Sequence, residues 1–117
     1  MKSIFDGWTK QIKHVMRDHK GGFCAHGWLV RRNALREVDR IGNWIIANMD
    51  PPRVWQHAHD YTLRPGSCPI AAIVWANNEG LLDIEGFKMV DLLSQGYIPK
   101  EATNGNQATT RDILQHS

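Results

Sequence analysis

Apolar side chains recur every three to four residues along much of the chain, which is the spacing of one face of an α-helix. In residues 3–19 the apolar positions at this spacing are Ile4, Phe5, Trp8, Ile12, Val15 and Met16. Ser3 can cap such a helix together with Asp6, and the sequence KGG at residues 20–22 is typical of a helix end. The pattern therefore predicts a first helix over residues 3–19.

A second helix is predicted to begin near Cys24 and to run to about Arg40. Its apolar stripe consists of Trp28, Leu35 and Val38. Gly42 is expected to bend or break it, and the apolar sequence NWIIANM then adds a further turn or two. Asp50 followed by two prolines has the composition of a new helix start. We expect that third helix to carry Val54, Trp55, Ala58 and Tyr61.

The second half of the chain contains two more apolar segments. The sequence LRPGSCP at residues 63–69 has the composition of a loop. IAAIVWA at residues 70–76 suits either a buried strand or a buried helix, and we favour the helix. Asp83 is expected to cap a last helix, which ends near SQG at residues 94–96. Its inward side chains are predicted to be Ile84, Phe87, Val90 and one of Leu92 and Leu93.

These segments predict a mainly α fold, a small single-domain bundle of about five helices with room for a short strand or hairpin. The chain has 117 residues, enough for one domain with its own core. We expect residues 1–98 to form the globular helical domain. Residues 99–117 are polar and contain TNGNQATT, which predicts a mobile tail.

Composition and charge narrow the class of protein. Hydrophobic residues make up 42% of the chain and charged residues 22%, as in a soluble globular protein. No apolar run reaches membrane-spanning length, and residues 1–20 are too charged for a signal peptide. We therefore expect a cytoplasmic protein without membrane contact, in which Cys24 and Cys68 are free thiols. The first half is basic: residues 1–64 hold eleven Lys and Arg against six Asp and Glu.

Cys24 is the candidate nucleophile. A cysteine at a helix start feels the helix dipole and unpaired N–H groups, which favour the thiolate. His57 or His59 could serve as its base. Asn77 or Asn78 could then orient that base, in the Cys, His, Asn order of papain-like hydrolases. The alternative, which we favour, is a buried structural thiol, because free cysteine is among the most buried residue types.

Cysteine and histidine also supply zinc ligands. The residues that could contribute are Cys24, His26, His57, His59 and Cys68. A Cys-x-His step is not a usual zinc pair, and the chain has neither a Cys-x-x-Cys knuckle nor a His-Glu-x-x-His helix. We therefore expect no metal and no other cofactor.

Three arginines suggest a binding surface. Arg32, Arg36 and Arg40 are spaced by four on the predicted second helix and would form one narrow stripe. The stripe could bind an acidic protein or a phosphate backbone, although a solvated face is the commoner outcome. Turn chemistry is enough to explain both Asn78 and Glu79 in ANNEG. We expect Glu79 to pair with an arginine of the second helix and so to connect the ANNEG turn to the arginine stripe.

The order of these motifs resembles that of small uncharacterised proteins of phages and bacteria. The pattern is FCAHGWLV with its Cys-x-x-Gly step, then IVWANNEG about fifty residues later, then the capped segment DIEGFKMVDLL. The matching positions are Cys24, Gly27, Asn78 and residues 84–92. Glu79 departs from the pattern, which has aspartate there. The resemblance implies a phage or mobile-element accessory protein and carries no activity with it.

The sequence thus supports three hypotheses of function. The leading one is a non-catalytic phage or mobile-element accessory protein that binds a protein partner. The first alternative is a small cysteine-dependent hydrolase that uses Cys24. The second is a nucleic-acid-binding protein that uses the arginine stripe.

Overall fold

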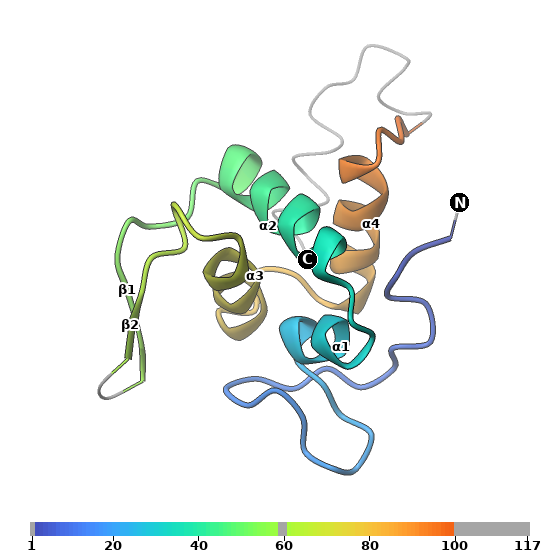
Figure 1. The fold of residues 1–117 in the computed structure, drawn as a ribbon, viewed down its shortest axis with the longest axis horizontal. Helices are drawn as coiled ribbons and strands as arrows, with labels where there is room; N and C mark the ends of the chain where they lie inside the picture. Colours follow the sequence, from blue (N-terminus) through green and yellow to red (C-terminus); the bar gives the residue numbers. More distant parts are fainter. Residues whose placement is uncertain (1, 59–60, 100–117) are drawn as a thin grey trace.

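The structure is a computed structural model that describes residues 2–58 and 61–99. Its elements, in chain order, are α1 (Ala25–Arg31), α2 (Leu35–Met49), β1 (Trp55–Ala58), β2 (Tyr61–Leu63), α3 (Pro69–Asn78) and α4 (Ile84–Ser94) (Figure 1). The prediction of a mainly helical fold is confirmed, and the structure contains a hairpin of the kind for which that prediction left room. The described residues form four helices rather than about five. The predicted tail lies, from residue 100 onward, outside the described residues.

The N-terminal segment, residues 2–24, is not the helix that was predicted. It runs as turns and extended chain along α1 and α4 (Figure 1). His14 and His19 have φ values of 74° and 61°, a left-handed conformation that a helix does not contain. Phe5 and Trp8 are buried as the helical spacing suggested, but tertiary contacts rather than a helix bring them inward.

Asp18 organises the loop that precedes α1. Its carboxylate accepts hydrogen bonds from the backbone N–H groups of Lys20 and Gly22, both at 2.8 Å, and pairs with Lys10 at 2.8 Å. The hydrogen bond from Lys10, together with the two backbone donors, holds the pKa of Asp18 well below its usual range. A local carboxylate therefore satisfies backbone donors that a helix would have paired with its own carbonyls.

The predicted second helix is two helices. α1 begins after Cys24, close to the predicted start, and ends at Arg31. Asn33 is left-handed, with φ 56°, and the Ala34 N–H bonds the Leu29 carbonyl at 3.0 Å to close the turn. Asparagine is one of the few residues that adopt this conformation at small cost, so the break falls there.

α2 is continuous through Gly42, where the sequence suggested a bend or break. A Cβ at Gly42 would lie 2.5 Å from the Cα of Pro69, so only glycine permits this approach between α2 and α3. α2 ends at Met49, and the next residue, Asp50, is left-handed with φ 51° and precedes two prolines. The α3 helix confirms the interpretation of residues 70–76 as helical, and it begins with Pro69.

The strands β1 and β2 form an antiparallel hairpin, where the sequence predicted a helix after Asp50. Trp55 pairs with Leu63, and Gln56 pairs with Thr62, with an irregularity in the register between Gln56 and Ala58. The hairpin stands apart from the four helices at one end of the molecule (Figure 1). The prolines before it and the β-branched and aromatic residues within it favour extended chain.

The core lies between the helices and the N-terminal segment. Its centre is an aromatic cluster in which Phe5 contacts Trp8 and Phe87 at centroid distances of 5.3 and 5.5 Å, and Trp8 stacks on Trp28 at 6.2 Å. α4 contributes Phe87 and begins at Asp83, whose side chain accepts the Gly86 N–H at 2.7 Å as predicted. None of the described helices is both long enough and apolar enough to cross a membrane.

Candidate functional site

A polar network connects the N-terminal segment, α1 and the end of α3. Its centre is Asn77, which is fully buried. The Asn77 Oδ1 accepts hydrogen bonds from the Ala25 N–H at 3.1 Å and from Gln11 Nε2 at 2.8 Å. Its Nδ2 donates to the Ile12 carbonyl at 2.9 Å and to Asn78 Oδ1 at 2.9 Å. All the hydrogen-bonding capacity of this amide is used, so Asn77 fixes how these three segments meet.

The network continues through Asn78 to the hairpin. Asn78 Oδ1 also accepts the His14 N–H at 3.1 Å, and Asn78 Nδ2 lies 3.4 Å from the Nδ1 of His57 on β1. The His57 ring stacks on the His14 ring at a centroid distance of 6.4 Å. The structure therefore brings two of the predicted hydrolase residues, His57 and Asn78, into contact. The other candidate base, His59, lies outside the described residues.

Cys24 lies beside this network but does not join it through its thiol. Cys24 is 5% exposed, and its Sγ accepts the Gly27 N–H at 3.3 Å as the cap of α1. Burial raises the pKa of the Cys24 thiol, although three backbone N–H groups oppose that effect. A nucleophilic cysteine needs the opposite shift and an adjacent base. Among the described residues, no histidine forms a hydrogen bond with this thiol.

The donor and acceptor roles in the contact between Asn78 and His57 are also the reverse of those that a hydrolase needs. In a Cys, His, Asn arrangement the asparagine oxygen accepts a hydrogen bond from an imidazole N–H and so orients the ring as a base. Here the oxygen of Asn78 is occupied by Asn77 and by the His14 N–H, and its amide nitrogen faces the ring. This geometry positions the imidazole without preparing it to take a proton from Cys24.

The residues considered as zinc ligands are spread over the fold. Cys24 is buried at the start of α1, whereas Cys68 is an exposed free thiol before α3. His26 is half-buried, and burial lowers its pKa. In the part of the chain that the structure describes, no group of three or more His, Cys, Asp or Glu side chains could hold a metal ion.

The three predicted binding arginines do not share one stripe, because the helix that was to carry them is broken. Arg32 follows α1, while Arg36 and Arg40 lie on α2. Arg40 donates to the buried carboxylate of Asp91 and, at 3.0 Å, to the hydroxyl of Ser94. Arg40 therefore stabilises the contact between α2 and α4, and of the three arginines only Arg32 and Arg36 are exposed.

The turn between α1 and α2 instead gathers a different set of exposed residues, which we call the arginine corner. It consists of Val30, Arg31, Arg32, Leu35 and Arg36. Leu35 is 69% exposed and Val30 is 47% exposed. The Arg32 guanidinium lies 3.0 Å above the centre of the Trp28 ring, and its Nη1 donates to the Trp28 carbonyl at 3.4 Å.

The arginine corner carries three positive charges. None of its three arginines forms an ion pair with a carboxylate of residues 2–58 or 61–99. Partial burial against the indole, and secondly the charge of Arg31, lower the pKa of Arg32. Arginine stays charged in spite of such a shift, so neighbouring like charges repel each other here and an anionic partner would relieve the repulsion.

Glu79 does not pair with an arginine as predicted. Its carboxylate accepts a hydrogen bond from the Trp55 indole at 2.6 Å, and no described arginine lies within ion-pair distance. The contact connects the end of α3 to the hairpin rather than to α2. Trp55 in turn lies against His57, with ring centroids 5.1 Å apart. Glu79 and Asn78 are therefore both anchors of the hairpin.

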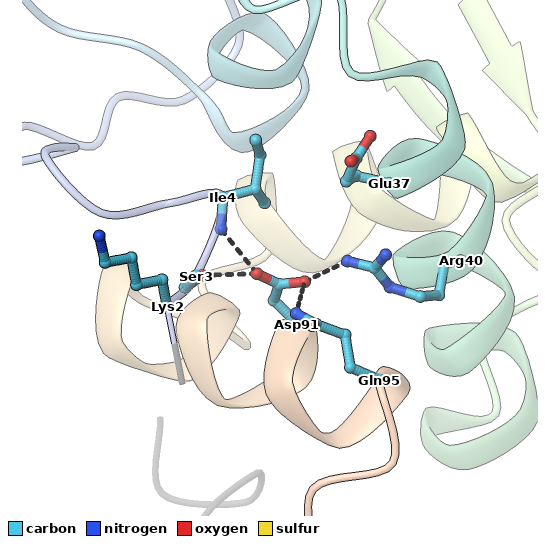
Figure 2. Close-up of a pocket in the computed structure, with 7 residues that line it drawn as sticks. All are labelled: Lys2, Ser3, Ile4, Glu37, Arg40, Asp91 and Gln95. Atoms are coloured by element: carbon cyan, nitrogen blue, oxygen red, sulfur yellow. Dashed lines mark hydrogen bonds and ion pairs between the residues drawn. The ribbon is translucent and has the colours of Figure 1, made fainter.

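A pocket of about 270 Å³ opens where the N-terminus meets α2 and α4 (Figure 2). Asp91 lies at its inner wall and is fully buried. Its carboxylate accepts hydrogen bonds from Ser3 Oγ at 2.7 Å, the Ile4 N–H at 2.8 Å, Gln95 Nε2 at 3.0 Å and Arg40. Figure 2 shows these donors converging on the carboxylate from three segments of the chain. With its acceptors occupied, Asp91 holds the fold together.

Sequence reasoning did not find Asp91 or Asn77 as the centres of these networks. Asp91 occurs in an amphipathic helix beside apolar neighbours. It lies three residues after Lys88 and four residues after Phe87, which places it on the inward face, and this position was the signal of burial that the sequence offered. Asn77 could not be distinguished from Asn78, because both precede a turn. Comparison of the chain with protein-family models, curated proteins and solved structures finds no match.

Proposed function

We propose that this protein is a non-catalytic accessory protein of phage or mobile-element type, and that it binds an acidic protein partner through the arginine corner. The observation that carries the proposal is the corner itself: residues 30–36 hold three exposed arginines without ion pairs among the described residues, together with two exposed aliphatic side chains. The free thiols of Cys24 and Cys68 suit a reducing cytoplasm, where we propose that the protein acts.

The composition of the corner favours a protein over a nucleic acid as the partner. Arginine binds carboxylates and phosphates alike through its planar fork of donors. Leu35 and Val30 add apolar surface beside the charges. A phosphate backbone offers these side chains no apolar surface, whereas a protein with acidic and apolar residues covers both parts of the corner. Arginine is also enriched at the energetic centres of protein interfaces.

The buried thiol argues against the hydrolase alternative. The Cys24 side chain is enclosed, burial raises its pKa, and the imidazole of His57 faces the amide nitrogen of Asn78. The cysteine and the Asn77–Asn78 pair instead stabilise the junction of α1, α3 and the N-terminal segment. We therefore propose a structural role for Cys24, as the sequence favoured.

Site-specific photo-crosslinking tests the proposal. A benzophenone amino acid at Leu35 should yield a discrete protein adduct in cells that express the chain. The same group at Glu85, whose side chain is 80% exposed on α4, is the matched control and should not. The adduct should disappear in an Arg31→Glu, Arg36→Glu background, which thermal melting should show to be folded because surface changes cost within about 0.5 kcal/mol each.

Three results would count against it. Equal adducts at both crosslinker positions, or none at Leu35, would remove the arginine corner as a protein-binding surface. Binding to a DNA duplex that weakens steeply with salt and is lost in the Arg31→Glu, Arg36→Glu variant would replace the protein partner with nucleic acid.

A further inference from the structure

The hairpin is connected to the helical body through side chains whose hydrogen-bonding roles are fixed by the backbone. The Ala25 N–H can only donate and the Ile12 carbonyl can only accept, so the orientation of the Asn77 amide is unambiguous. Asn77 Nδ2 then donates to Asn78 Oδ1, which also accepts the His14 N–H. The Asn78 amide is therefore fixed as well, with its Nδ2 toward His57.

This chain of bonds sets the role that the facing ring nitrogen of His57 takes in the contact. An amide N–H₂ group can only donate, so the facing Nδ1 of His57 must accept. An imidazole with Nδ1 as an acceptor is neutral and carries its proton on Nε2. We propose that the hairpin is a pH-sensitive element: its contact with α3 requires neutral His57, and protonation of His57 breaks that contact.

The titratable groups near this contact come from the N-terminal segment and from the end of α3. His14, whose ring stacks on His57, and Lys13, whose Nζ lies against Gly80, come from the N-terminal segment. Glu79, at the end of α3, accepts the Trp55 indole, and the Trp55 ring lies against His57.

Protonation therefore removes one anchor of the hairpin. Nδ1 becomes a donor that faces the Asn78 donor, so that contact is lost. The Trp55 ring, whose centroid lies 5.1 Å from that of His57, is placed to report the change. Histidine side chains ordinarily change charge between about pH 5 and 8. The hairpin should be held in place at the upper end of this range and repositioned at the lower end.

Nuclear magnetic resonance tests the proposal on the full chain. Long-range proton–nitrogen spectra at pH 8 should show His57 as the Nε2–H tautomer. As the pH falls, the indole N–H signal of Trp55 should shift with the titration of His57. The signals of the other four tryptophans serve as internal references. The matched control is the His19→Gln variant, which changes an exposed histidine. The pH-dependent shift of the Trp55 indole N–H signal should be the same in this variant as in the native chain.

The Asn78→Asp variant gives the sharpest outcome. Aspartate keeps the oxygen that accepts from His14 and replaces the donating Nδ2 with an oxygen that accepts. The contact should then favour the imidazolium, and the midpoint of the His57 titration should rise by about 1 pH unit. An Nδ1–H tautomer in the native chain would overturn the proposal. A Trp55 signal that ignores the titration, or an unchanged midpoint in the Asn78→Asp variant, would overturn it equally.

Discussion

Removal of the Asp91 carboxylate should cause a large loss of stability. This carboxylate is fully buried and accepts from Arg40, Ser3 Oγ, the Ile4 N–H and Gln95. Its partners come from the N-terminus, α2 and the end of α4, so one residue joins three segments of the chain. The Asp91→Ala variant would leave these donors without their acceptor.

The structure sets the size of the effect. Removing one partner of a buried ion pair typically costs about 3–5 kcal/mol. The Arg40 side chain is 32% exposed, so water can solvate part of its charge after the change, which favours the lower end of that range. The Ile4 N–H adds about 1 kcal/mol if it stays unpaired. We expect Asp91→Ala to lower the free energy of unfolding by about 3–4 kcal/mol, a large share of the roughly 5–15 kcal/mol of a typical domain.

Urea unfolding followed by circular dichroism measures this loss. Glu85→Gln changes an exposed carboxylate on the same helix and is the matched control, with an expected change within about 0.5 kcal/mol. Asp91→Asn should fall between the two, because the amide keeps one acceptor and faces the remaining donors with an N–H₂ group. A loss below about 1 kcal/mol for both Asp91 variants would show that the network is not what holds the N-terminal segment in place.

Two further predictions concern the junction of α1 with the N-terminal segment. A Cβ at Gly27 would lie 2.7 Å from the carbonyl carbon of Met16, so Gly27→Ala should destabilise by at least about 1–3 kcal/mol in thermal or urea unfolding; an unchanged midpoint would contradict this close approach. Because burial encloses the Cys24 thiol and raises its pKa, iodoacetamide near neutral pH should label exposed Cys68 first, as read by peptide mass spectrometry. Faster labelling of Cys24 in the folded chain would restore the hydrolase hypothesis.

The local sequence determined the elements whose ends carry their own signals. Asp83 caps α4 and Pro69 opens α3, and each acts on groups within one turn of the chain. The start of α1 at Cys24 was likewise visible after the glycines. In the first nineteen positions, Phe5 and Trp8 also go inward as their spacing suggested. What the pattern did not show is that this burial needs no helix.

Tertiary structure decided the N-terminal segment, the hairpin and the candidate sites. Residues 2–24 find hydrogen-bonding partners in Asp91 and Asn77, which lie more than fifty residues away along the chain, and these partners replace the internal bonds of a helix. Periodicity cannot reveal such partners, because it reports which side chains are apolar and not where the backbone donors go. Periodicity also did not reveal the turn at Asn33, which separates Arg32 from the helix of Arg40. That break turned a predicted stripe into one exposed corner and one buried ion pair.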